Sequence, residues 1–215
     1  MEQTGSEART TTIILCRHGE SEGNLEQRFG GHSPTPLSAH GKAQARSAGH
    51  VLKRLGVDVV YSSDLVRAAQ TAQLITEVTG THTRMTSALR ERSVGRLTDL
   101  TFADAKARFP DDFAALLRME TNSCPPGGES YAACRVRAAA CLNQALLEHP
   151  GQRVLLVSHY VTMMQLIMHI LGVSQDAKNP RLSFQVDHCA LHIFERHESR
   201  GWKVIALNDR THLTA

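Results

Sequence analysis

The stretch TTIILCRHGES, Thr11–Ser21, begins as an apolar, β-branched run and ends in an arginine, a histidine and a glycine. Its first part predicts a buried strand at Ile13–Cys16, because β-branched and apolar side chains fit a sheet that is covered on both faces. Charged side chains at the tip of such a strand add nothing to the core. We therefore expect Arg17 and His18 to belong to a functional site at the end of this strand.

Patterns typical of strands and helices alternate along the rest of the chain. This alternation predicts an α/β fold, a three-layer α/β/α sandwich with a mostly parallel sheet, in which the last two strands form an antiparallel hairpin at one edge. Between residues 97 and 128 the pattern changes to two short helices broken at Pro110, which we interpret as an insertion over the strand ends. Strands are predicted at 57–61, 83–86, 154–158, 190–194 and 203–207, and helices at 38–55, 64–79, 129–148 and 160–171.

The composition limits the classes of protein and partner. The 215 residues, 41% of them hydrophobic, suffice for one sizeable α/β domain or two small ones. The net charge of +3 is too small to indicate a nucleic-acid-binding face. The five cysteines are odd in number and form no CxxC pair, so a disulfide framework is not expected and a reducing compartment fits best. Because residues 1–10 contain no apolar signal segment, we expect a cytoplasmic location.

One segment, Val154–Val173, is long and apolar enough to resemble a membrane span. It contains Ser158, His159, Gln165 and His169, which are polar groups that a true span avoids. A buried strand that passes directly into a core helix explains the segment better, so no membrane partner is expected.

The strand ends deliver a consistent set of side chains. Ligands of an open parallel sheet bind outside the carboxyl ends of its strands. The first predicted strand delivers Arg17 and His18, the second delivers Arg67 one turn into the next helix, and the strand at 154–158 delivers His159. Two guanidiniums suit the planar recognition of phosphate oxygens, and Asn24 is placed to add a neutral donor. The set predicts an anion-binding site that contains a nucleophile.

His18 is the candidate nucleophile, because an imidazole can attack phosphorus and leave again. Its attacking nitrogen must be unprotonated, which requires the other ring nitrogen to donate a hydrogen bond, and we expect a backbone carbonyl as the acceptor. His159 and the two arginines would stabilise charge on the phosphoryl oxygens. Gly19 is expected to make room for the phosphate, because it has no Cβ.

Glu91, in the stretch ALRERSVGR, is the candidate proton donor for the leaving group. A carboxyl group close to phosphate oxygens has its pKa raised by the like charge, as a general acid near neutral pH requires. The plain alternative is an exposed Glu91 paired with Arg90 or Arg92, and the local sequence leaves both interpretations open. Glu20 competes for the role, but we expect it to brace the arginines instead.

Six motifs in order resemble the histidine phosphatase superfamily, which includes the cofactor-dependent phosphoglycerate mutases. The resemblance runs from about residue 12 to residue 213. It implies a phosphoglycerate mutase-like fold, with a single domain over residues 1–215 and a short cap insertion at about 97–128, and at the level of the family it implies a homodimer. The motifs are RHGESEGN (17–24), PLSAHGKAQA (36–45), SSDLVRAAQTA (62–72), LRERSVGRL (89–97), GGES (127–130) and VSH (157–159).

The resemblance also implies roles for individual residues. His18 would be the phosphorylated nucleophile and Glu91 the proton donor, and no metal or other cofactor is implied. The phosphate pocket would be formed by Arg17, Arg67 and His159, with Asn24 and Arg28 at further phosphate-loop positions.

Three departures from the family pattern bear on the substrate. Tyr160 stands where a glycine is common, so its ring would pack on the cap, or it would narrow the pocket or donate its hydroxyl to substrate. GRLTD, Gly95–Asp99, replaces a pattern resembling G-x-W-E-G, so a relative's substrate cannot be carried over. Gly23 stands at the position of the tryptophan in RHGESxWN, the pattern that the mutases resemble. Together with the short insertion, this favours the phosphatase branch.

The charge of the insertion favours a small substrate. Residues 92–128 carry five basic and five acidic side chains, a balance that gives no electrostatic preference for a polyanion. We therefore predict a metal-independent phosphomonoester hydrolase that acts through a phosphohistidine on a small phosphorylated metabolite. The alternatives are phosphoglycerate mutase-type phosphoryl transfer and a non-catalytic phosphate-binding protein on this fold.

A metal site is the rival from another class of chemistry. The stretch DHCALH contains His188, Cys189 and His192. On a strand the two histidines would share one face while the cysteine points to the other, and no further ligands at suitable spacing complete a tetrahedral set. A bound metal is therefore not expected.

Overall fold

A six-stranded sheet forms the centre of the protein. The computed structural model describes residues 9–118, 122–174 and 182–213. The strand order is β3-β2-β4-β1-β5-β6, with β1 to β4 parallel and the hairpin β5–β6 antiparallel to its neighbours. The strands are β1 (Thr10–Arg17), β2 (Val59–Ser63), β3 (Thr83–Thr86), β4 (Arg153–Ser158), β5 (Leu191–His197) and β6 (Gly201–Asp209).

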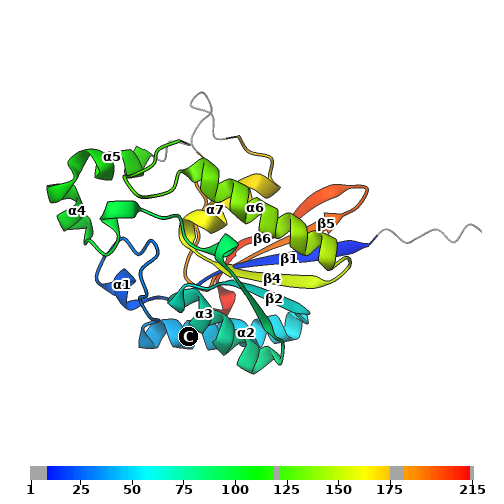
Figure 1. Ribbon diagram of the computed structural model, residues 1–215. Helices are drawn as coiled ribbons and strands as arrows, with labels where there is room; N and C mark the ends of the chain where they lie inside the picture. The colour runs from blue at the N-terminus through cyan, green and yellow to red at the C-terminus, as the bar shows by residue number, and fades with distance from the viewer. Residues whose placement is uncertain (1–8, 119–121, 175–181, 214–215) are drawn as a thin grey trace, which may run out of the picture.

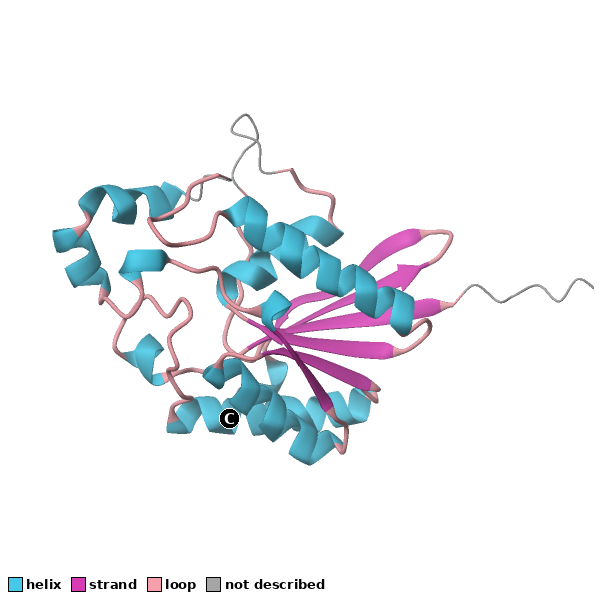
Figure 2. Ribbon diagram, viewed as in Figure 1, coloured by secondary structure: helices cyan, strands magenta, loops and turns pink. Residues whose placement is uncertain are grey.

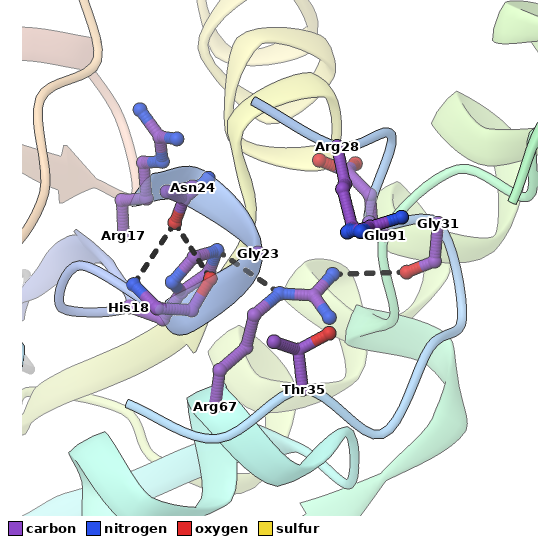
Figure 3. Close-up of a pocket in the computed structure, with 11 residues that line it drawn as sticks. Arg17, His18, Gly23, Asn24, Arg28, Gly31, Thr35, Arg67 and Glu91 are labelled. Carbon is purple, nitrogen blue, oxygen red and sulfur yellow. Dashed lines mark hydrogen bonds between the residues drawn. The ribbon is translucent and has the colours of Figure 1, made fainter. Parts of the chain in front are cut away.

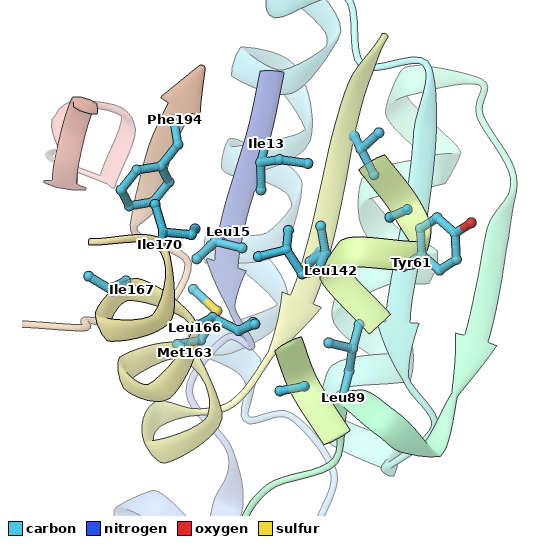
Figure 4. Packing of buried hydrophobic residues seen from close by; sticks show 14 of the residues in the cluster. Ile13, Leu15, Tyr61, Leu89, Leu142, Met163, Leu166, Ile167, Ile170 and Phe194 are labelled. Carbon is cyan, nitrogen blue, oxygen red and sulfur yellow. The ribbon is translucent and has the colours of Figure 1, made fainter. Parts of the chain in front are cut away.

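Helices cover both faces of this sheet (Figures 1 and 2). Successive side chains of β1 alternate between the faces: Ile13 and Leu15 pack toward α6 and α7, as Figure 4 shows, whereas Ile14 and Cys16 pack toward α2 and α3. The structure is the predicted three-layer α/β/α sandwich with a mostly parallel sheet. The covering helices are α2 (Ala39–Leu55), α3 (Val66–Thr79), α6 (Tyr131–Glu148) and α7 (Tyr160–Ile170).

The predicted elements are present, with shifted ends. The helix expected from residue 64 begins at Val66, and the carboxylate of Asp64, just before it, accepts from the guanidinium of Arg90 at 2.6 and 2.7 Å. The helix expected from residue 129 begins after Ser130, whose side chain accepts from the N–H of Ala133. The segment of membrane-span length divides into β4 and α7, and within the described ranges no helix is long and apolar enough to cross a bilayer.

Short elements lie over the end of the sheet at which β1 finishes (Figure 1). The expected break at Pro110 is confirmed, because α4 ends at Arg108 and α5 begins at the proline. A small apolar cluster that includes Leu97 and Leu116 holds these elements together. The elements are α1 (Glu22–Leu25), α4 (Phe102–Arg108), α5 (Pro110–Arg118) and the 3-10 turns η1 (Ser87–Leu89) and η2 (Gly95–Leu97), with a third turn η3 (Thr211–Leu213) near the chain end.

Two residues that depart from the family pattern have clear places in this region. Leu97, which stands where a tryptophan is common, is fully buried in the cluster. Asp99, which stands where a glycine is common, has a φ of 65°, a left-handed conformation that glycine adopts easily and that Asp adopts more readily than most residues. Asp99 therefore holds a backbone conformation that a glycine at this position would adopt without strain.

Candidate active site

His18 lies buried at the carboxyl end of β1, where the sheet register fixes its position. The last pairs of the parallel ladder are Cys16 with Val157 and Arg17 with Ser158, and the N–H of His18 donates to the carbonyl of Ser158 at 2.9 Å. The ends of β1 and β4 therefore meet at one edge of the sheet. This register brings residues that are more than 140 positions apart into the same site.

The ring of His18 is held in a single tautomer. Its Nδ1 lies 2.7 Å from the carbonyl oxygen of Gly19, which can only accept, so the proton is on Nδ1 and Nε2 is bare. The expected hydrogen bond to a backbone carbonyl is thus present. Burial, followed by the charges of Arg67 and Arg17, lowers the pKa of His18 well below its ordinary value. The imidazole is consequently neutral at pH 7, as a nucleophile must be.

The turn after His18 is held by α2, and this corrects the role expected for Gly19. A Cβ on Gly19 would overlap the carbonyl of Gly41, so the glycine allows a close approach of helix and turn, not of phosphate. Glu20 also serves this contact, because its carboxylate accepts from the N-cap hydroxyl of Ser38 at 2.7 Å. The expectation that Glu20 braces the arginines is therefore wrong.

Arg67 and Arg17 approach His18 from different sides. Arg67 is buried, and its Nε donates to Nε2 of His18 at 3.2 Å while its Nη atoms donate to the carbonyls of Gly31 and Ser33 (Figure 3). Arg17 donates from Nη1 to the carbonyl of Val186 at 2.8 Å. Three of the five N–H groups of Arg67 are used in this way, so two stay available to an anion.

A cavity of about 60 Å³ opens beside His18. Compared with the volume that one water molecule needs, this cavity has room for about four to six atoms of the size of a water oxygen, which matches a phosphoryl group. The cavity is lined by Arg17, His18, Ser21, Gly23, Asn24, Arg28, Gly30, Gly31, Thr35, Arg67 and Glu91.

His159 lies at the end of β4, fully buried, with its ring centroid 5.0 Å from that of His18. Its Nε2 is 2.8 Å from the hydroxyl of Ser63, and its Nδ1 has no partner among the residues that the structure describes. Burial and the charge of Arg67 lower the pKa of His159 well below its ordinary value. Two neutral histidines therefore stand side by side.

Glu91 lines the same cavity, and its carboxylate lies at the amino end of α7. Backbone N–H groups of Val161 and Thr162 donate to it at 3.2 and 3.3 Å. The alternative of a surface pair with a neighbouring arginine is excluded, because Arg90 pairs with Asp64 and the guanidinium of Arg92 stacks 4.1 Å from the ring of Tyr131. The helix end that follows His159 thus also positions Glu91.

Asn24 and Arg28 lie where the resemblance implies, on the wall of the cavity. Arg28 is partly exposed and links the cavity rim to the cap by donating to the carbonyl of Asp99 at 2.7 Å. Tyr160 takes a position that neither alternative named: its ring lies against Arg17, whose guanidinium carbon is 5.3 Å from the ring centroid. A contact of its hydroxyl with substrate stays a prediction.

His188, considered above only as a possible metal ligand, is a member of this site. Its ring centroid is 5.7 Å from that of His18, and its Nε2 is 3.1 Å from Oδ1 of Asn24. The expectation that His188 and His192 share a strand face is wrong, because β5 begins at Leu191 and His188 lies in the preceding turn. In the described ranges no group of three or more His, Cys, Asp or Glu side chains could hold a metal ion. The sequence does contain a signal that could place His188 in the site, because an antiparallel strand starts at the edge where its parallel neighbours end.

The three-layer sandwich, with a buried histidine between two arginines at the carboxyl end of β1, is the arrangement of enzymes with a histidine phosphatase fold. The chain belongs to the Histidine phosphatase superfamily (branch 1), which it matches over residues 13–210. It is 32% identical over 207 residues to the protein named "Probable phosphoglycerate mutase GpmB" of Salmonella newport, covering 94% of this chain and 95% of the relative.

Solved structures give the same result. A mycobacterial glucosyl-3-phosphoglycerate phosphatase superposes with a TM-score of 0.81 at 27% identity, over 94% of this chain and 100% of the other. The alpha-ribazole phosphatase from Shigella flexneri superposes with a TM-score of 0.80 at 25% identity, over 92% and 96% of the two chains. The relatives thus include proteins named for phosphatase and for mutase chemistry.

Proposed function

We propose that the protein is a phosphomonoester hydrolase that works through a phosphohistidine on Nε2 of His18. The observation that carries the proposal is the hydrogen bond from Nδ1 of His18 to the carbonyl of Gly19, at 2.7 Å, which leaves Nε2 bare beside the cavity. A protein that only bound phosphate would gain nothing from a buried, neutral imidazole at that point, since a cationic one would bind an anion better.

The proposed first step transfers the phosphoryl group to His18. The Nε2 lone pair attacks phosphorus while the bond to the leaving oxygen breaks, and Glu91 gives that oxygen its proton. Arg67 donates to the same lone pair at 3.2 Å in the free site. Charged phosphoryl oxygens are stronger acceptors, so bound substrate takes over this hydrogen bond and frees the lone pair.

The proposed second step returns the enzyme to its starting state. Water attacks phosphorus, its proton passes to the carboxylate of Glu91, and the N–P bond breaks with the electron pair returning to Nε2 of His18. Arg17, Arg67 and His159 stabilise the charge on the phosphoryl oxygens in both steps. The arginines supply the positive charge, so we propose a metal-independent reaction.

The size and charge of the site favour a small phosphorylated metabolite as substrate. The cavity of about 60 Å³ accepts a phosphoryl group, and the rest of the substrate must lie toward the cap, whose basic and acidic side chains are balanced in number. All five cysteines are free thiols, which supports the proposal of a cytoplasmic, reducing location. A metabolite, with neither nucleic acid nor membrane, is the proposed partner.

Mutase chemistry is the second candidate, because the 32% identical relatives are named as phosphoglycerate mutases. Both reactions share the phosphohistidine and differ in what attacks it. A mutase must keep water away until a second hydroxyl takes the phosphoryl group, whereas a hydrolase admits water. Release of inorganic phosphate in place of transfer between two positions of phosphoglycerate would support the hydrolase.

The decisive experiment traps the intermediate. The protein is mixed briefly with a radiolabelled aryl phosphate, denatured and digested, and the label is mapped. We expect a label on His18 that survives base and is lost in acid, and we expect none in His18→Ala. A label that survives acid but is lost in base would indicate a carboxyl phosphate and overturn the mechanism.

A phosphate-release screen then identifies the substrate. A panel of phosphorylated metabolites is tested with and without a chelator, and one compound with a far higher kcat/KM than the others names the function. Loss of activity with the chelator would contradict the metal-independent reaction.

A further inference from the structure

We propose that His188 is a positioning residue that holds the side-chain amide of Asn24 with its NH2 group toward the phosphoryl group. The inference rests on the proposed function, because it concerns the same phosphate site. It assigns to His188 a task that neither a structural turn nor a metal site would require.

The orientation of the Asn24 amide is fixed by a neighbour that can only donate. The backbone N–H of Ser21 lies 3.1 Å from Oδ1 of Asn24, and the Ser21 hydroxyl donates to the same atom at 2.8 Å. A backbone N–H cannot accept, so the atom facing it must be the amide oxygen. The usual ambiguity between the oxygen and the nitrogen of an asparagine is thereby removed.

His188 supplies the third donor to this oxygen. Its Nε2 lies 3.1 Å from Oδ1 of Asn24, and since that oxygen only accepts, Nε2 must carry the proton. Burial, followed by the charge of Arg17, lowers the pKa of His188 to about 3. The ring is therefore neutral at pH 7 and adds a hydrogen bond to Asn24 without adding charge beside His18.

With three donors on its oxygen, the amide cannot flip without losing all of them. The NH2 group of Asn24 finds no acceptor among the described residues, and Asn24 lines the cavity beside His18. Figure 3 shows the oxygen of Asn24 directed at its own loop and the nitrogen on the opposite side. The two free N–H groups are thus held ready for a phosphoryl oxygen before substrate arrives.

The position of His188 is itself anchored to β1, the strand that leads to the nucleophile His18. The N–H of Cys189 donates to the carbonyl of Arg17 at 3.0 Å, and Cys189 has a φ of 54°, which turns the chain into β5. The His188 ring lies 5.7 Å from the His18 ring, centroid to centroid. The end of β1, the turn that contains His188 and the side-chain amide of Asn24 are therefore connected to one another.

The test is a double-mutant cycle between His188 and Asn24. The variants are His188→Phe, which keeps a ring but removes the donor, Asn24→Ala, and the double variant. The measurements are the dissociation constant of inorganic phosphate and kcat/KM for an aryl phosphate. We expect His188→Phe to weaken phosphate binding about tenfold, as loss of one hydrogen bond implies. In the Asn24→Ala background the same substitution should have almost no further effect.

A conservative variant separates positioning from packing. In His188→Gln the side-chain NH2 reaches about as far as the imidazole Nε2, so we expect phosphate affinity to recover most of the loss seen with phenylalanine. Thermal unfolding of each variant verifies that it is folded. Equal losses for glutamine and phenylalanine would overturn the inference, as would effects of His188→Phe that multiply fully with those of Asn24→Ala.

Failure of this inference and failure of the proposed function give different results. If the unmodified protein forms the His18 phosphoenzyme but His188→Phe binds phosphate normally, the inference alone is overturned. If the cycle shows the expected coupling for phosphate binding but no phosphoenzyme forms, His188 positions Asn24 in a site that is not catalytic. The inference then stands while the proposed hydrolase is overturned.

Discussion

His18 and His159 stand at the ends of two neighbouring parallel strands, with ring centroids 5.0 Å apart. Both are buried, and in both, burial and the charge of Arg67 lower the pKa well below its ordinary value. They differ in the partner that each ring keeps. Nδ1 of His18 meets the carbonyl of Gly19, whereas Nε2 of His159 meets the hydroxyl of Ser63.

This difference in partner assigns different chemistry to the same side chain. A carbonyl only accepts, so it leaves His18 with a bare Nε2, which can attack phosphorus. The hydroxyl of Ser63 already accepts from the N–H of Leu65 at 3.2 Å, so its own proton is free to donate to Nε2 of His159. With the Ser63 hydroxyl donating to Nε2, we expect the proton of His159 on Nδ1, which would make His159 a neutral donor.

The largest effect should come from replacing each histidine by asparagine, which tests the assignment directly. We expect His18→Asn to lose turnover by about 10⁴-fold or more and to form no phosphoenzyme, since the nucleophile is gone. His159→Asn should lose about 10²- to 10³-fold, as removal of one charge-stabilising donor does, and should still be labelled at His18. Turnover and acid-labile label are the measurements. A label on the second histidine in His18→Asn would reverse the assignment.

Arg67→Met tests the electrostatic link between the two rings. Arg67 contributes to the lowered pKa of both histidines, after burial. Removing a cation makes protonation easier, so both values should rise toward 6.5, and the acid limit of activity should move to higher pH. The ring titrations are measured by NMR. We also expect kcat/KM to fall about 10²- to 10³-fold, because a phosphate donor is lost.

Arg67→Lys is the matched control for this prediction. It keeps a positive charge but loses the planar fork that serves two carbonyls and a ring nitrogen. The histidine titrations should stay near those of the unmodified protein while phosphate binding weakens. Titrations that stay unchanged in the methionine variant would show that burial alone sets the pKa values.

Glu91→Gln tests whether Glu91, and neither histidine, gives the leaving group its proton. Val161 and Thr162 donate to different oxygens of Glu91, so glutamine keeps an acceptor for one of these two N–H groups, and it offers no acidic proton. We expect about a 10²-fold loss of kcat with an alkyl phosphate, whose leaving oxygen needs a proton, and a much smaller loss with a nitrophenyl phosphate. Equal losses for both substrates would contradict a general-acid role and indicate a structural one.

Much of this arrangement could be predicted from the sequence, because its causes are local. Apolar runs such as the one in β1 alternate with segments that have the apolar spacing of helices. This alternation is enough to predict the three layers and the mostly parallel sheet. The rule that ligands bind at the carboxyl ends of parallel strands then selected Arg17, His18, Arg67 and His159. The structure brings these four together at one edge.

The rest depends on contacts between distant segments. Applying the rule to strand ends alone missed His188, because β5 is antiparallel and brings its beginning to the same edge. The sequence alone suggests a contact of Gly19 with phosphate, because it does not show that Gly41 of α2 lies against this glycine. Besides the adjacent N–H of Arg92, Glu91 accepts from the N–H groups of Val161 and Thr162, which lie 70 and 71 residues further along the chain, and no local pattern predicts these two.

The smallest predicted effect tests the partner that sets the His159 tautomer. In Ser63→Ala the donor to Nε2 is lost, so His159 can move its proton to Nε2 and turn a bare Nδ1 toward the phosphoryl group. We expect about a tenfold loss of kcat, the value of one hydrogen bond, with the titration of His18 unchanged. Ser63→Thr, which keeps the hydroxyl, should restore most of the rate. The ring ¹⁵N shifts of His159 report the tautomer, and a proton found on Nε2 in the unmodified protein would show that the two histidines do not divide the chemistry in this way.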